Sequence, residues 1–289
     1  MPKATQPDPL APNPDRAPHA ETQSFRVHEH FHSEFLPTDR SVVVFLPPGY
    51  DAASPQRYPV LYLHDGQNVF DPATAFGGQE WHVDGTARAL IEARQIEPLI
   101  IVGVYNAGEK RIDEYTPTKV PSRGGGLADL YGRLLVEELK PFIDREYKTL
   151  PSAANTGLGG SSLGGLVTLH LGLKYPTVFG RLAVLSPSVW WDNRAILKEV
   201  AALRSKPPLR IWLDAGTGEG NEVLDDTRAL RDALVAKGWV IDKDLKYHEA
   251  EGHGHSERAW RERVNPILQY LFPERRRTPR SSAAVKGRR

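Results

Sequence analysis

The sequence contains no cysteine among its 289 residues. This absence excludes disulfide bonds, thiolate zinc sites and a cysteine nucleophile. Serine is therefore the natural candidate for any covalent catalysis in this chain.

An excess of charge and a long apolar run are also missing. Lys and Arg number 37 against 36 Asp and Glu, for a formal net charge of +1, which argues against nucleic acid as a partner. No window approaches the roughly 18 continuous apolar residues of a membrane span. The Pro- and Ala-rich N-terminus lacks the apolar core of a secretory signal, so we expect a cytoplasmic protein with no membrane partner.

The two ends of the chain have few periodic apolar residues. We predict disordered tails at residues 1–24 and 274–289, the second of them basic, because neither can offset the entropy of ordering. Residues 25–273 are long enough to form one large domain with its own core.

Between the tails, short apolar β-branched runs alternate with longer helical patterns. Most of the central runs are apolar on both faces, as in a parallel sheet that helices cover on both sides. We therefore predict a single α/β domain with a mostly parallel central sheet and helices on both faces. The predicted strands are 41–48, 58–66, 98–106, 155–160, 181–188, 209–216 and 240–250, and the predicted helices are 80–95, 126–147, 163–175, 191–205, 221–238 and 256–272. Pro141 and Pro266 are expected to kink or restart two of the helices.

A glycine-rich turn carries two adjacent serines between the fourth predicted strand and the helix after it. A nucleophile elbow, G-x-S-x-G, needs glycine two residues before and after its serine because the backbone passes too close for a larger side chain. Centred on Ser162, those positions are Gly160 and Gly164, whereas centred on Ser161 the second is Leu163. The sequence therefore predicts Ser162 as the nucleophile.

A serine nucleophile needs an imidazole base and a carboxylate that orients the base, and in this fold both follow the serine in the chain. Of the later histidines, two stand in the glycine-flanked loop EGHGHSERAW, residues 251–260, namely His253 and His255. For the acid, Glu219 just after the strand LRIWLDAG is the first choice. Asp214 in that strand is the alternative acid, although it could instead be a buried structural carboxylate with no catalytic role.

The developing oxyanion needs two fixed amide donors, one from the residue after the nucleophile and one from the loop after an earlier strand. These would be Leu163 and a residue of HDGQN, residues 64–68. Gly66 permits a tight turn there, so Gln67 can aim its amide inward.

With these residues in place, the chain resembles the Putative esterase family of α/β-hydrolases, which includes enterochelin esterases, feruloyl esterases and mycolyltransferases. The resemblance runs from about residue 26 to 273 and rests on VVVFLPPGY, YPVLYLHDGQNVF, RIDEYTP, LKPFIDREY, GGSSLGG, SPSVWW and GHSERAW in that order. It implies Ser162 as nucleophile, His255 as base, Glu219 as acid, and the amides of Gln67 and Leu163 as oxyanion hole. Asp214 or Glu222 could stand in for the acid.

Other residues are candidates for binding substrate. Trp190 and Trp191 in SPSVWW could form an apolar wall or belong to the core. Arg111 and Tyr115 could bind a polar or anionic substrate group, although Arg111 could equally form a structural ion pair. Asn68, the last residue of the predicted oxyanion loop, is a further candidate.

No cofactor or metal is expected. His28, His30 and His32 alternate as if on one strand face, a possible metal site, but no carboxylate at ligand spacing supports it. We interpret them as a solvated face.

The leading hypothesis is a serine esterase that acts on a small-molecule ester through an acyl-enzyme. An acyltransferase would use the same residues and admit an alcohol in place of water. A binding module on a hydrolase scaffold is the third alternative, although every triad position has a candidate here.

Overall fold

Eight strands of the computed structural model, which describes residues 24–274, form one sheet. The predicted tails therefore lie outside the described residues, except for Ser24 and Glu274 at their inner ends. The strand order is β1-β2-β4-β3-β7-β8-β9-β10, and β1, β2 and β4 pair antiparallel while all other neighbours are parallel. The predicted mostly parallel sheet is confirmed. Its strands are β1 Phe25–Phe31, β2 Arg40–Phe45, β3 Val60–His64, β4 Ile100–Val104, β7 Thr156–Ser161, β8 Arg181–Leu185, β9 Arg210–Gly216 and β10 Leu245–Ala250.

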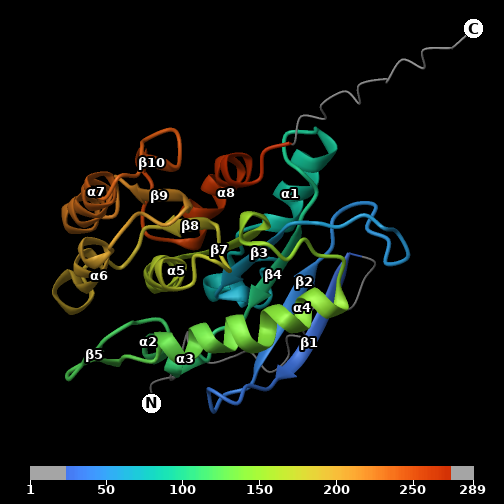
Figure 1. Ribbon diagram of the computed structural model, residues 1–289, viewed down its shortest axis with the longest axis horizontal. Helices are drawn as coiled ribbons and strands as arrows, with labels where there is room; N and C mark the ends of the chain where they lie inside the picture. Colours follow the sequence, from blue (N-terminus) through green and yellow to red (C-terminus); the bar gives the residue numbers. More distant parts are fainter. Residues whose placement is uncertain (1–23, 275–289) are drawn as a thin grey trace, which may run out of the picture.

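Helices cover both faces of this sheet (Figure 1). They are α1 Val83–Glu92, α2 Arg111–Glu114, α3 Ala128–Arg133, α4 Lys140–Glu146, α5 Leu163–Lys174, α6 Trp191–Ala202, α7 Asn221–Ala236 and α8 Glu257–Leu271. A π-helical turn, Leu134–Leu139, joins α3 to α4 just before Pro141, and Pro266 lies inside α8. Short 3₁₀ turns, η1 Gly66–Asn68 and η2 Phe76–Gly78, follow β3.

Two apolar cores lie on opposite faces of the sheet because alternate strand residues point to opposite sides. Val42 and Val44 of β2 belong to the core that α5, α6 and α7 cover. Val43 and Phe45 of the same strand belong to the core beneath α1 and α8. This double burial explains why the central strands read as continuous apolar runs rather than alternating ones.

The histidine pattern near the N-terminus does not form one face, so that part of the sequence analysis was wrong. The β1–β2 register shifts between His28 and Phe31, and His30 has a φ of 53°, which breaks the alternation of side chains. His28 Nε2 lies 2.6 Å from Tyr147 Oη, whereas His32, beyond the strand, lies 2.8 Å from Asp39.

Two negative findings apply to the described chain. Within residues 24–274, no group of three or more His, Asp or Glu side chains could hold a metal ion. In the same range, no helix is both long and apolar enough to cross a membrane.

A short hairpin was not predicted. Strands β5 Lys119–Val120 and β6 Gly124–Gly125 pair antiparallel outside the main sheet. The hairpin extends away from the sheet beside α2 (Figure 1).

Candidate active site

Ser162 stands at the sharp turn between β7 and α5. Its φ of 58° and ψ of −121° are strained for a residue with a side chain, at a cost of about 1–3 kcal/mol. Its backbone N–H donates to the carbonyl of Leu185 in the neighbouring strand β8 at 3.0 Å. This strained turn is the backbone geometry of a nucleophile elbow.

The flanking glycines are required by close packing. A Cβ on Gly160 would lie 3.0 Å from His64 Cδ2 and from the backbone of Gly164, and one on Gly164 would lie 3.2 Å from Asp65 Oδ2. Ser161, in contrast, is the buried last residue of β7. Ser162 is therefore the serine that leaves the sheet.

Glu219 and His255 come together at the same edge of the sheet. His255 Nδ1 and Glu219 Oε2 are 2.7 Å apart. The other carboxylate oxygen, Oε1, accepts from Ser186 Oγ at 2.6 Å and from the Gly216 amide at 2.7 Å. Burial of the side chain would raise the pKa of Glu219, but the hydrogen bonds from His255, Ser186 and Gly216 prevail and lower it. The carboxylate is thus ionised and fixed in direction beside the imidazole.

Asp214, the alternative acid, has other partners. Its side chain is buried in β9 and accepts from Arg263 Nη1 and Trp212 Nε1, each at 2.7 Å. Burial raises the pKa of Asp214 to about 6 although Arg263 opposes that shift. Asp214 has the contacts of a structural carboxylate, and Glu219 is the acid in contact with His255.

The two histidines of the loop before α8 have different partners. His253 Nε2 lies 3.1 Å from Glu262 Oε2, on α8. His255 stands just before Ser256, whose side chain accepts from the Ala259 amide and so caps α8. The His255 ring also packs edge-on against Trp260, with ring centroids 4.9 Å apart.

Ser162 lies at the same sheet edge as the acid and the histidine, because β7, β9 and β10 are parallel and all three residues follow carboxyl ends of strands. Within residues 24–274, the hydrogen bond of the Ser162 hydroxyl is with Ser188 Oγ, at 3.4 Å, and not with His255. Long or unformed catalytic hydrogen bonds are common without substrate. Ser186 and Ser188, which the sequence analysis did not single out, both belong to the SPS segment after β8.

The two predicted oxyanion donors have unused amides. Leu163 is the first residue of α5, where backbone N–H groups have no partner within the helix. Gln67 lies in η1, and its side-chain Oε1 accepts from the Asn106 amide at 3.3 Å. Among the hydrogen bonds of residues 24–274, none uses the backbone N–H of Gln67 or Leu163 as donor.

Among the predicted substrate-binding residues, Trp190 is exposed, whereas Trp191 and Arg111 are hydrogen-bonded to other residues of the protein. Trp190 is 42% exposed, whereas Trp191 is 1% exposed and donates from Nε1 to Thr118. Trp191 is therefore a core residue and not a pocket wall. Arg111 holds Asp65 through two hydrogen bonds of 2.7 and 2.8 Å, which is the structural ion pair named as its alternative.

Asn68 joins loops instead of facing an open pocket. Its Nδ2 donates to Glu257 Oε1 at 2.9 Å and its Oδ1 accepts from the Phe76 amide at 2.9 Å. Glu257, which the sequence analysis missed, is partly buried near Asp65, and burial together with that neighbouring charge raises the pKa of Glu257 to about 7. Its only sequence signal is its position two residues after His255.

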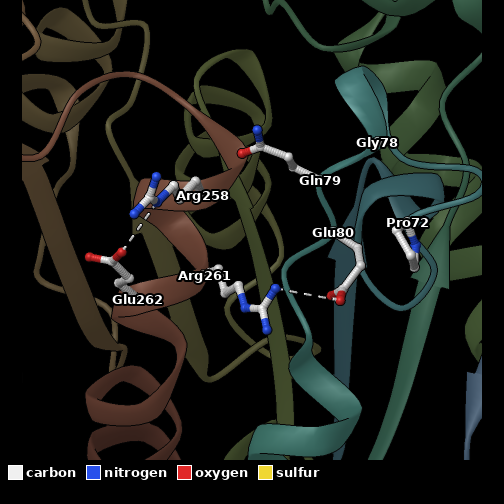
Figure 2. Close-up of a pocket in the computed structure, with 7 residues that line it drawn as sticks. All are labelled: Pro72, Gly78, Gln79, Glu80, Arg258, Arg261 and Glu262. Atoms are coloured by element: carbon white, nitrogen blue, oxygen red, sulfur yellow. Dashed lines mark ion pairs between the residues drawn. The ribbon is translucent and has the colours of Figure 1, made fainter.

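A cavity of about 420 Å³ opens between the η2 segment and the start of α8, as Figure 2 shows. Arg261 and Glu80 face each other across it at 3.7 Å, and Arg258 lies 3.8 Å from Glu262. The cavity therefore balances its own charges and has no net charge that would attract an ion. Its lining residues are Pro72, Gly78, Gln79, Glu80, Arg258, Arg261 and Glu262.

Comparison with known proteins gives several relatives that are named esterases. The chain is 28% identical to the ferri-bacillibactin esterase BesA of Bacillus subtilis over 243 residues, which cover 75% of this chain and 80% of that protein. It is 27% identical to an endo-1,4-beta-xylanase/feruloyl esterase of Xylanibacter ruminicola over 249 residues, covering 84% of this chain and 30% of that protein.

Solved structures of similar fold include the BES protein from Bacillus cereus, with a TM-score of 0.71, 24% identity and coverage of 89% of this chain and 97% of that one. The enterobactin esterase FES from Shigella flexneri, determined in the presence of enterobactin, gives a TM-score of 0.71 and 25% identity over 88% of this chain and 60% of that one. The profile of the Putative esterase family matches residues 33–271. The chain belongs to this family of α/β-hydrolases and is a carboxylic ester hydrolase.

Proposed function

We propose that this enzyme cleaves esters through a covalent acyl-enzyme with Ser162 as nucleophile, His255 as base and Glu219 as the acid. The observation that carries the proposal is the 2.7 Å contact between Glu219 Oε2 and His255 Nδ1, at the sheet edge where Ser162 forms its strained turn. Because the Nδ1–H group of His255 donates a hydrogen bond to Glu219, the Nε2 atom is left as the proton acceptor.

The reaction proceeds in two halves. Ser162 Oγ attacks the ester carbonyl carbon while His255 takes the hydroxyl proton, and the carbonyl oxygen becomes an oxyanion that accepts from the amides of Gln67 and Leu163. The intermediate collapses, and the alcohol leaves with the proton from His255. Water, deprotonated by His255, then attacks the acyl carbon. The bond from that carbon to Ser162 Oγ breaks, His255 returns the proton to Oγ, and the acid is released.

For the substrate, we propose esters of aromatic acids. One relative is named a feruloyl esterase, and a feruloyl group carries an aromatic ring. Trp190 offers this chain an exposed aromatic surface two residues beyond Ser188, whose amide donates to the carbonyl of Ser162 at 3.0 Å. The Arg123 guanidinium, with Cζ 5.0 Å from the Trp190 ring centroid, supports the orientation of that ring.

The test is labelling combined with a substrate panel. A fluorophosphonate should add once, at Ser162 by peptide mass spectrometry, and Ser162→Ala should lose about 10⁵- to 10⁶-fold in kcat. Ser161→Ala is the matched control and should retain activity, because its side chain is buried in β7. Labelling elsewhere, or full activity in Ser162→Ala, would overturn the assignment.

The substrate arm compares feruloyl, 2,3-dihydroxybenzoyl and acetyl esters of one alcohol. Trp190→Ala should raise KM for the two aromatic esters about threefold to tenfold and leave the acetyl ester unchanged. An equal effect on all three esters would reject Trp190 as an aromatic subsite.

A further inference from the structure

Asp65 occupies an unusual backbone position at the end of β3. It has a φ of 55° and a ψ of 46°, in the left-handed region that residues with side chains seldom adopt. It is also only 4% exposed. A buried charged residue in this conformation persists only where its surroundings hold it.

Three side chains hold Asp65. Tyr115 Oη accepts from the Asp65 backbone N–H at 3.2 Å, and Tyr115 is itself fully buried. Arg111 donates to both carboxylate oxygens, and Asn106 Nδ2 donates to Oδ1 at 2.7 Å. Both backbone and side chain of Asp65 are therefore clamped from the segment that follows β4.

The clamped carboxylate also lies beside the nucleophile elbow. Asp65 Oδ2 lies 3.2 Å from the place that a Cβ on Gly164 would occupy. Gly164 follows Leu163, one oxyanion donor, while Asp65 precedes Gln67, the other, by two residues. The turn from Asp65 to Gln67 is tightly packed, because a Cβ on Gly66 would lie 2.4 Å from the carbonyl carbon of Gly103 in β4.

We propose that Asp65 is a positioning residue that sets the two oxyanion amides relative to one another, with Tyr115 and Arg111 as its clamp. Its left-handed backbone turns the chain so that the Gln67 amide faces the serine, and its carboxylate packs against the helix start that carries the Leu163 amide. Arg111 neutralises the carboxylate, so that no uncompensated negative charge stands beside the developing oxyanion. This role rests on the proposed function.

The proposal predicts a specific kinetic signature. Amide donors displaced by a fraction of an ångström weaken transition-state binding more than ground-state binding. Tyr115→Phe removes the acceptor for the Asp65 amide together with the hydroxyl contact to Tyr131. Gly164→Ala pushes on the Asp65 carboxylate from the other side. Each should lower kcat about 10- to 100-fold with KM changed less than about threefold.

The experiment measures kcat, KM and the inhibition constant of an aryl boronic acid, which forms a tetrahedral adduct with an active-site serine. In both variants, boronate affinity should fall by the same factor as kcat/KM. Tyr50→Phe is the matched control, because Tyr50 Oη accepts from the Lys148 amide at the same 3.2 Å. Tyr50 contacts Tyr58, just before the other end of β3, so Tyr50→Phe should leave all three constants unchanged.

Distinct outcomes separate the possible failures. If wild type is not labelled at Ser162, the proposed function itself fails. If wild type is labelled and active but the two variants retain kcat, or change only KM or thermal stability, the positioning role is wrong. Should Tyr115→Phe fail to fold, Asn106→Ala takes its place with the same expected loss of kcat, because Asn106 Nδ2 donates to Asp65 Oδ1 at 2.7 Å and Asn106 lies outside the nucleophile elbow.

Discussion

The two candidate acids, Glu219 and Asp214, should fail in different ways when each is replaced by its amide. Glu219 Oε1 accepts from Ser186 Oγ and the Gly216 amide, so in Glu219→Gln the amide oxygen must take that place. The amide NH₂ then faces His255 Nδ1, where Oε2 was. An NH₂ donating to Nδ1 selects the imidazole tautomer with its proton on Nε2, which cannot accept the serine proton.

The expected magnitude follows from that tautomer change. Glu219→Gln should lower kcat by about 10³- to 10⁴-fold. Its melting temperature should change little, because the hydrogen bonds to Oε1 survive.

Asp214→Asn should show the opposite behaviour. It removes the charge opposite Arg263, which is buried and 2.7 Å away, and leaves that guanidinium with only the 3.5 Å contact to Glu219 as an ion pair. Breaking a buried pair costs about 3–5 kcal/mol, which corresponds to a fall in melting temperature on the order of 10 °C. The contact between Glu219 and His255 is unchanged, so kcat should stay within about tenfold of wild type.

The assay is steady-state hydrolysis of an aryl ester below the melting temperature. For wild type and Asp214→Asn, kcat is calculated per active site, and the concentration of active sites is measured by titration with a fluorophosphonate. Thermal melts by fluorescence run alongside. If Asp214→Asn melts like wild type but has lost turnover while Glu219→Gln remains active, our assignment of the acid is wrong.

Two further predictions concern the loop before α8 and the first residue of that helix. His255→Ala should abolish nearly all ester turnover, while His253→Ala, whose imidazole pairs with Glu262, should change kcat/KM by no more than about tenfold; the reverse result would mean that the wrong histidine was chosen. Glu257 has a folded-state pKa raised to about 7 against an ordinary value of 4.5, so its protonated form favours the fold and that stability is lost as pH rises from 4.5 through 7. Glu257→Gln, which keeps an acceptor for Asn68, should melt increasingly above wild type across this window and by a constant amount beyond it. Melting curves from pH 4 to 9 measure the difference, and a difference independent of pH would contradict the shift.

Local chemistry determined much of this protein from the sequence alone. Apolar runs buried on both faces predicted the parallel strands, and helical periodicity predicted the elements that cover them. Gly160 and Gly164 distinguished Ser162 from Ser161, because the G-x-S-x-G spacing by itself shows around which serine the backbone can make so tight a turn. The cap residue Ser256 marked the start of α8 and so favoured His255 over His253.

Tertiary structure decided the rest, because those contacts join residues far apart in the chain. Asp214 and Glu219 are five positions apart, but the first points from β9 toward Arg263 and the second folds back from the following turn onto His255. Trp190 and Trp191 are neighbours, and only the second reaches Thr118 and the core. Arg111 was equally consistent with substrate binding and with an ion pair until the buried Asp65 appeared as its partner. Side-chain direction depends on strand register, turn geometry and distant partners, and none of these is encoded by a residue's type or its immediate neighbours.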